Sequence, residues 1–237
     1  MVFGAILAGG VGARMNISSM PKQFLMLGEK PIIIHTLEKM LLSNKIDKVF
    51  VGVHSNWISH TENILKKYIV DTSRVHVVKG GKDRNGTIMN IIGGIEEKYG
   101  ASDKHIIVTH DAVRPFVTIR ILEENIEMAT KYGACDTVIK STDTIVESKD
   151  GKNISDIPDR SILYQGQTPQ SFNVALLKRL YQDLNDQERK TLTDACKICV
   201  INNIPVALVK GETLNVKITT TADYRVAQAI VGGKIID

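Results

Sequence analysis

The sequence is poor in the features that mark several common protein classes. It has only three cysteines, an odd number that disfavours a secreted scaffold held by disulfides. Aromatic residues make up 5% of the chain, and the formal net charge is only +4, with lysine and arginine spread along it. Nucleic-acid surfaces usually combine basic clusters with stacking aromatic side chains. We therefore expect no nucleic-acid partner, although a basic pocket for a small anion stays open.

Long apolar runs are absent as well. The N-terminal apolar stretch covers only Val2 to Leu7, too short to span a bilayer, and no charged leader precedes it. We expect no membrane contact and a soluble, cytoplasmic protein. The 237 residues, 43% hydrophobic and 24% charged, suit a single domain over 1–237 with a sizeable core.

Two of the cysteines form the pair Cys196-x-x-Cys199, a spacing that metal and redox sites use. A second ligand pair at suitable spacing is absent from the sequence, and the flanking residues Ile198, Val200 and Ile201 are apolar. A buried structural pair is the favoured interpretation.

Strand-like and helical patterns alternate along the first 140 residues. Such alternation predicts βαβ units, and hence an α/β fold: a single Rossmann-like, doubly wound, mostly parallel sheet whose strand-end loops share one edge. The expected strands are Val2–Leu7, Lys48–Val53, Val75–Val78, His105–Thr109 and Thr137–Lys140, and the expected helices are Ile32–Leu42, Trp57–Tyr68, Asn85–Lys98 and Ile119–Tyr132.

This alternation of strand and helix patterns ends at about residue 140. Two extended stretches, Thr142 to Ser148 and Ile154 onward, flank a turn at residues 149–153 that contains Asp150-Gly151, a hairpin signal. We expect a protruding β-arm at about 141–163 that contacts a partner subunit, giving a homodimer; a floppy surface hairpin is the alternative. Beyond the arm we expect a helix over Asn173–Tyr181, a strand over Val206–Leu208 and a final helix from about Thr221 to Val231.

The N-terminal strand leads directly into Ala8-Gly9-Gly10-Val11-Gly12-Ala13-Arg14-Met15, and Pro21-Lys22-Gln23 follows. A glycine-rich turn at a strand's end presents backbone N–H groups where nucleotide phosphates bind in open α/β folds. The P-loop pattern is absent, and Met15 replaces the third glycine of a dinucleotide fingerprint. An ordinary strand-to-helix turn would not need two cations. Arg14 and Lys22 therefore indicate a site where charge develops during a reaction.

Four later segments fall where loops should project from the same sheet edge. The stretch Gly80 to Thr87 offers a helix N-terminus that could hold a base and ribose, and Asp111 follows a buried strand, the usual position for a carboxylate that holds Mg²⁺ against phosphates. His110 is interpreted as structural or hydrogen-bonding. The third segment spans Asp156 to Phe172. It contains Arg160, which could read a second substrate's phosphate across a dimer interface, or form a surface salt bridge.

The fourth segment pairs Thr193-Asp194 with Asn215-Val216-Lys217-Ile218-Thr219. Lys217 alternates there with apolar residues on an expected strand end, which favours a phosphate contact. The motifs singled out over the whole chain are, in order, Leu7-Ala8-Gly9-Gly10-x-Gly12-x-Arg14-Met15, Pro21-Lys22-Gln23, Gly80-Gly81-x-x-Arg84, His110-Asp111-x-x-Arg114-Pro115, Gln167-Thr168-Pro169-Gln170 and Val216-Lys217-Ile218-Thr219.

This ordered set resembles the family of cytidylyltransferases that act on polyol phosphates. The resemblance implies a fold of the nucleotide-diphospho-sugar transferase type, a divalent cation such as Mg²⁺, and the reaction of CTP with a polyol phosphate to give a CDP-polyol and pyrophosphate. It assigns catalysis to Arg14, Lys22, Arg160 and Lys217; CTP binding to Leu7, Ala8, Gly9, Gly10, Gly12, Gly81, Lys82, Asp83, Arg84, Asn85, Gly86, Thr87, Asp111 and Ala112; acceptor binding to Arg114, Thr144, Thr168 and Thr193; and the metal to Asp111.

Two acceptors occur in the family, ribitol 5-phosphate for teichoic acid synthesis and 2-C-methyl-D-erythritol 4-phosphate for isoprenoid synthesis. The segments Tyr164 to Gln170 and Leu192 to Lys197, together with Gly10 and Val113, resemble the ribitol branch. We therefore expect ribitol 5-phosphate as acceptor, with methylerythritol phosphate as the alternative. Two rival classes are a non-catalytic nucleotide-binding regulator and a sugar-1-phosphate nucleotidyltransferase that uses UTP or GTP.

Overall fold

The computed structural model describes residues 1–10 and 20–233. Its strands are β1 (Val2–Ala8), β2 (Met26–Leu27), β3 (Lys30–Pro31), β4 (Lys48–Val53), β5 (Val75–Lys79), β6 (Ile106–Asp111), β7 (Ala134–Lys140), β8 (Tyr164–Asn173) and β9 (Ala207–Lys210). Its α-helices are α1 (Ile32–Leu42), α2 (Ile58–Tyr68), α3 (Arg84–Tyr99), α4 (Ile119–Tyr132), α5 (Val174–Asp183), α6 (Asp186–Lys190), α7 (Cys196–Ile201) and α8 (Thr221–Val231).

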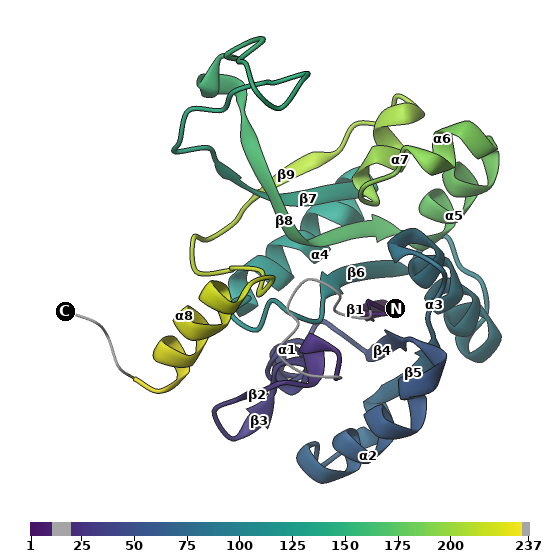
Figure 1. The fold of residues 1–237 in the computed structure, drawn as a ribbon. Helices are drawn as coiled ribbons and strands as arrows, with labels where there is room; N and C mark the ends of the chain where they lie inside the picture. Colours follow the sequence, from purple (N-terminus) through teal and green to yellow (C-terminus); the bar gives the residue numbers. More distant parts are fainter. Residues whose placement is uncertain (11–19, 234–237) are drawn as a thin grey trace.

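A seven-stranded sheet in the order β5-β4-β1-β6-β8-β7-β9 crosses the molecule (Figure 1). All of its strands run parallel except β8, which pairs antiparallel with both β6 and β7. The mostly parallel doubly wound α/β fold is thus confirmed. Because β1 and β6 are neighbours in register, the loops that follow them leave the same sheet edge side by side.

Helices cover both faces of the sheet. One apolar cluster packs α1, α2 and α4 against the sheet through side chains such as Leu37, Leu65 and Ile121. A second cluster packs α3, α5 and α7 against the opposite face through Ile91, Leu177 and Ile198. This two-sided burial explains why β1, β4 and β6 are apolar almost throughout rather than alternating.

The expected strands and helices of the first 140 residues are all present, with small shifts at their ends. Helices α1, α4 and α8 begin and end at the predicted residues, and β4 does as well. The prediction missed β8, which lies in a stretch interpreted as a loop, and the short helices α6 and α7. The expected strand end over Asn215–Thr219 is also absent, since that segment has no regular secondary structure.

The arm at 141–163 projects beyond the ends of β7 and β8 (Figure 1). Its two branches run antiparallel, but the expected pair of strands reduces to a single bridge between Glu147 and Asp156. Side chains satisfy much of the backbone instead: Asp150 Oδ1 accepts from the N–H groups of Lys152 and Asn153, each over 2.8 Å. Such local hydrogen bonds compete with a strand ladder, which explains the irregular arm.

Candidate active site

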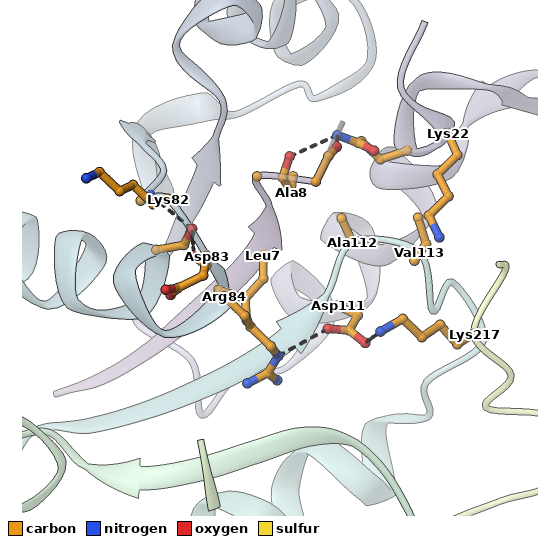
Figure 2. Close-up of a pocket in the computed structure, with 15 residues that line it drawn as sticks. Leu7, Ala8, Lys22, Lys82, Asp83, Arg84, Asp111, Ala112, Val113 and Lys217 are labelled. Carbon is orange, nitrogen blue, oxygen red and sulfur yellow. Dashed lines mark hydrogen bonds and ion pairs between the residues drawn. The ribbon is translucent and has the colours of Figure 1, made fainter. Parts of the chain in front are cut away.

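A cavity of about 420 Å³ opens at the sheet edge where β1 and β6 end and α3 begins (Figure 2). Its walls come from the two predicted glycine-rich segments and from the segment after β6. The lining residues are Leu7, Ala8, Gly9, Gly10, Lys22, Gln23, Gly81, Lys82, Asp83, Arg84, Thr87, Asp111, Ala112, Val113 and Lys217.

The first wall is the turn after β1, and Gln23 holds it in place. The buried Gln23 side chain donates from Nε2 to the carbonyl oxygens of Ala8, over 2.8 Å, and Gly10, over 3.0 Å. These bonds tie the glycine turn to the short helix Lys22–Phe24, so that Lys22 lines the same cavity. Sequence reasoning did not place Gln23 in the site, although its position beside Lys22 was the available signal. Gly12 and Arg14 lie outside the described residues.

The second wall is the turn from β5 into α3. Asp83 caps the helix, since its Oδ1 accepts from the Gly86 N–H over 2.7 Å. A Cβ on Gly81 would lie 2.3 Å from the Gly86 carbonyl carbon, so only glycine fits there. The Thr87 hydroxyl accepts from the Gly81 N–H and donates to the Asp83 carbonyl oxygen, and these two hydrogen bonds stabilise the turn.

Asp111 lies at the floor of the cavity among three cations. Lys217 Nζ is 2.8 Å from Oδ2, while Arg84 Nε and Arg114 Nε are each 3.6 Å from a carboxylate oxygen. Figure 2 shows Arg84 and Lys217 reaching the carboxylate from opposite sides. Burial alone would raise the pKa of Asp111, but the charges of Arg84, Lys217 and Arg114 outweigh it and hold the pKa well below its usual range. Asp111 is therefore ionised at neutral pH.

His110 and Thr168 fix the backbone of Asp111 from behind the cavity. His110 Nε2 lies 3.0 Å from the Arg114 carbonyl oxygen and Nδ1 lies 2.8 Å from the Thr168 hydroxyl. That hydroxyl also accepts from the Asp111 N–H over 3.2 Å. Complete burial lowers the pKa of His110 to about 4, so the ring is neutral. The prediction of a structural, hydrogen-bonding His110 is confirmed.

Lys217 reaches the site from an irregular segment rather than from a strand. The Ile218 N–H donates to the Val113 carbonyl oxygen over 2.9 Å, and Arg114 donates from Nη1 to the Asn215 carbonyl oxygen over 2.7 Å. These two bonds fasten the segment to the loop after β6. Lys217 is placed beside Asp111 as a result.

Several predicted residues lie away from the cavity lining. Arg160 and Thr144 are exposed on the arm, where Arg160 donates to the Thr142 carbonyl oxygen over 2.8 Å. Thr193 is exposed ahead of α7, whereas Thr168 is buried. Asn85 and Gly86 belong to the second wall, with Asn85 facing a smaller neighbouring cavity.

Cys196 and Cys199 are buried on the opposite side of the sheet from α4, which confirms their expected burial. Among the described residues, no helix is both long and apolar enough to cross a membrane.

The residues at the cavity floor suit a Mg²⁺ ion that a substrate brings with it. Mg²⁺ keeps several waters and is typically bound by one or two carboxylates together with substrate phosphates. Asp111 supplies one ionised carboxylate, and the described residues contain no group of three acidic, histidine or cysteine side chains that could hold a metal alone. Asp111 could serve as the one protein ligand to such an ion, which would share the carboxylate with Lys217, Arg84 and Arg114.

The fold and the cavity define a nucleotide-binding α/β protein with a cationic site at the end of its first strand. Residues 2–233 match the family described as "IspD: 2-C-methyl-D-erythritol 4-phosphate cytidylyltransferase". The chain belongs to this family, and it is a cytidylyltransferase, a member of the nucleotidyltransferases.

Solved structures of similar proteins share the fold over nearly the whole chain. A 4-diphosphocytidyl-2C-methyl-D-erythritol synthase from Anaerococcus prevotii is 26% identical with a TM-score of 0.79, covering 98% of this chain and 96% of its own. The 2-C-methyl-D-erythritol 4-phosphate cytidylyltransferase of Francisella tularensis is 23% identical with a TM-score of 0.79, covering 95% and 97%. The Thermus thermophilus enzyme of that name is 24% identical with a TM-score of 0.73, covering 98% and 100%.

Proposed function

We propose that this protein transfers CMP from CTP to a polyol phosphate, releasing pyrophosphate. The observation that carries the proposal is the ionised Asp111, surrounded by Lys217, Arg84 and Arg114 at the floor of a cavity whose wall is a glycine-rich turn. Such a site combines backbone N–H groups for phosphates with cations for developing negative charge.

The reaction needs no general base, which agrees with the site's composition. A phosphate monoester has a second pKa of about 6, so it is mostly dianionic near neutral pH and attacks the α-phosphate without losing a proton. His110 is neutral and both of its ring nitrogens are occupied behind the cavity. The barrier is electrostatic, because an anion must approach a polyanion, and positioned cations lower it.

Each group then has a role in binding or charge stabilisation. The turn from Ala8 to Gly10 cradles the triphosphate, and Lys22, with Arg14, stabilises the five-coordinate α-phosphate and the leaving pyrophosphate. The Gly81 to Thr87 turn receives cytosine and ribose. Lys217 stands beside the α-phosphate. Asp111 would hold Mg²⁺, which would neutralise part of the triphosphate charge.

For the acceptor, we propose D-ribitol 5-phosphate, and hence CDP-ribitol for teichoic acid synthesis. The support is sequence resemblance over Tyr164 to Gln170 and Leu192 to Lys197. The Gln167 side chain hydrogen-bonds to Glu212 and Asn215, and the Thr168 hydroxyl to His110 and Asp111. Because these bonds are internal to the protein, the two side chains favour neither acceptor.

The second candidate acceptor is 2-C-methyl-D-erythritol 4-phosphate. The family description and the names of the similar structures favour this acceptor over ribitol 5-phosphate. The two candidates differ in the carbon chain, because methylerythritol carries a methyl branch and fewer hydroxyls than ribitol, while both supply the attacking phosphate.

Steady-state kinetics with both acceptors test these proposals. Pyrophosphate release is measured with CTP, Mg²⁺ and each polyol phosphate, with UTP and GTP as competitors. We expect turnover only with CTP, and a kcat/KM for ribitol 5-phosphate at least about 10² above that for methylerythritol phosphate. The reverse preference would assign the chain to isoprenoid synthesis. Absence of pyrophosphate with both acceptors would refute the proposed function, and preference for UTP or GTP with a sugar 1-phosphate would favour the rival class.

We further propose that the arm joins two copies of the chain, and that Arg160 orients an acceptor phosphate in the neighbouring site. Apolar side chains on the arm support this, since Ile154, Ile157 and Ile162 are 61%, 57% and 72% exposed. An arm with a single β-bridge and such a surface is marginal by itself.

A further inference from the structure

Asp136 is a half-buried carboxylate in the middle of β7 that the proposed chemistry leaves without a role. It pairs in register with Gln170 of the antiparallel strand β8. Ala134 belongs to the apolar cluster beneath α3, α5 and α7, and side chains two residues apart on a strand share a face. Asp136 and Gln170 therefore stand together on the face of the sheet from which Arg84 reaches Asp111.

Polar atoms without partners gather at this point. Within the described part of the chain, Asp136 Oδ1, Gln170 Oε1 and both terminal nitrogens of Arg84 are buried and make no hydrogen bond. The Gln170 side chain hydrogen-bonds to the Asp136 carboxyl, on which the charges of Asp194 and Arg84 also act, while Asp136 Oδ1 and Gln170 Oε1 stay without a partner among the described residues. Leaving a buried polar group unpaired is unfavourable, so several such groups in one place indicate a missing partner.

The open side of this cluster is next to Gly166 of β8. Gly166 is exposed, and a Cβ built on it would lie 3.6 Å from Asp136 Oδ2. Position 166 therefore places no side chain between Asp136 Oδ2 and the exposed edge of β8.

We propose that Asp136, Gln170 and Arg84 form a subsite for hydroxyl groups of the acceptor polyol, an inference that rests on the proposed function. A hydroxyl donates one hydrogen bond and accepts others, which matches a carboxylate and an amide oxygen facing a guanidinium group. Strand β7 lies two strands from β6, roughly 10 Å by ordinary strand spacing, and β6 ends at Asp111. The carbon chain would extend from the phosphate near Asp111 toward β7.

This subsite would determine acceptor specificity. A site that hydrogen-bonds substrate hydroxyls rejects an analogue lacking them, because its own buried polar groups then stay unpaired. Burial raises the pKa of Asp136 to about 6, and the neighbouring Asp194 contributes in the same direction. At pH 8 the carboxylate is ionised and accepts hydrogen bonds only.

Two variants test the subsite at pH 8. Asp136→Asn replaces one acceptor by a donor without changing size, and Gly166→Ala adds a methyl group beside Asp136 Oδ2 at ordinary contact distance. Asp183→Asn, at the exposed end of α5, is the matched control. We expect Asp136→Asn and Gly166→Ala to raise KM for ribitol 5-phosphate at least about tenfold, with KM for CTP unchanged. The ratio of kcat/KM for ribitol 5-phosphate to that for methylerythritol phosphate should fall in both variants. A purely structural Asp136 would leave the preference between acceptors unchanged.

Calorimetric titration of ribitol 5-phosphate into each protein gives a second readout. We expect weaker binding to both variants and wild-type binding to the control. If wild type binds and converts the acceptor but both variants match it, only the subsite is refuted. If wild type neither binds nor converts either polyol phosphate, the proposed function and the subsite fail together.

Discussion

Lys217 Nζ and Asp111 Oδ2 lie 2.8 Å apart, which joins the irregular segment after β9 to the end of β6. Asp111 is mostly buried, whereas Lys217 is 40% exposed, so the ion pair faces the cavity on the lysine side. A bound triphosphate would therefore meet both partners. The Asp111 carboxylate positions the Lys217 side chain, and the charge of Lys217 helps to lower the pKa of Asp111, so that the carboxyl group stays ionised.

Replacing a cation of the site should reduce turnover without unfolding the protein. We expect Lys22→Ala, Arg14→Ala and Lys217→Ala each to lower kcat by about 10²–10³, because each removes a charge donor to the transition state. Lys66→Ala, on the exposed face of α2, is the control. Pyrophosphate release and thermal melts measure the two effects, and wild-type turnover in a variant would remove that residue from the mechanism.

Thr168→Val should distinguish positioning from acceptor contact. The substitution leaves His110 Nδ1 and the Asp111 N–H without their buried partner. We expect a loss of about 1–3 kcal/mol in the free energy of unfolding and a lower kcat, with KM for the acceptor unchanged. Denaturant titration and acceptor kinetics provide the measurements. A rise in acceptor KM alone would show that the hydroxyl contacts the polyol.

Deletion of residues 142–161 should convert a dimer into monomers. The arm exposes several large apolar side chains and holds one β-bridge, so it gains stability by packing against another copy. Sedimentation velocity at micromolar concentration measures the change. The double variant I154S/I157S is a milder form of the same experiment. A monomeric full-length protein would contradict the proposed dimer contact.

The stability of the protein should depend on Asp136 between about pH 4 and 6. Burial raises the pKa of this carboxyl from 3.8 to about 6, so over that range the folded state holds a proton that the unfolded state has released. The free energy of unfolding therefore falls as pH rises through the window, by at most about 3 kcal/mol. We expect Asp136→Asn to gain stability relative to wild type across the same range in urea titrations. A difference that stays constant with pH would contradict the shifted pKa.

The three cysteines should be unreactive while the protein is folded. All are buried, and burial raises the pKa of Cys135 to about 12 and that of Cys199 to about 11. Because the thiolate is the reactive form, we expect no labelling by a thiol reagent at pH 8 and complete labelling in guanidinium chloride. Mass spectrometry counts the modified sites. Rapid labelling of native Cys196 or Cys199 would argue for an accessible pair.

Local pattern predicted most of the sheet and its helices. Apolar runs bounded by turns fixed β1, β4 and β6, and a 3.6-residue periodicity fixed α1 and α4, because each pattern records which faces are buried. Strand β8 escaped prediction because its polar sequence, Tyr164 to Asn173, resembles a loop. Its burial is decided by β6 and β7, which pair with it from either side.

The sequence by itself also indicated which groups meet at the site. A glycine turn follows β1, Lys22 comes later in the chain and Asp111 ends β6, and parallel neighbours such as β1 and β6 bring their ends together. Only the tertiary structure decided how the charges pair. Arg84 and Lys217 meet at Asp111 from opposite sides, and Gln170 stands opposite Asp136, through contacts between segments far apart in the chain. Such contacts depend on strand order and loop anchoring, which no local pattern records.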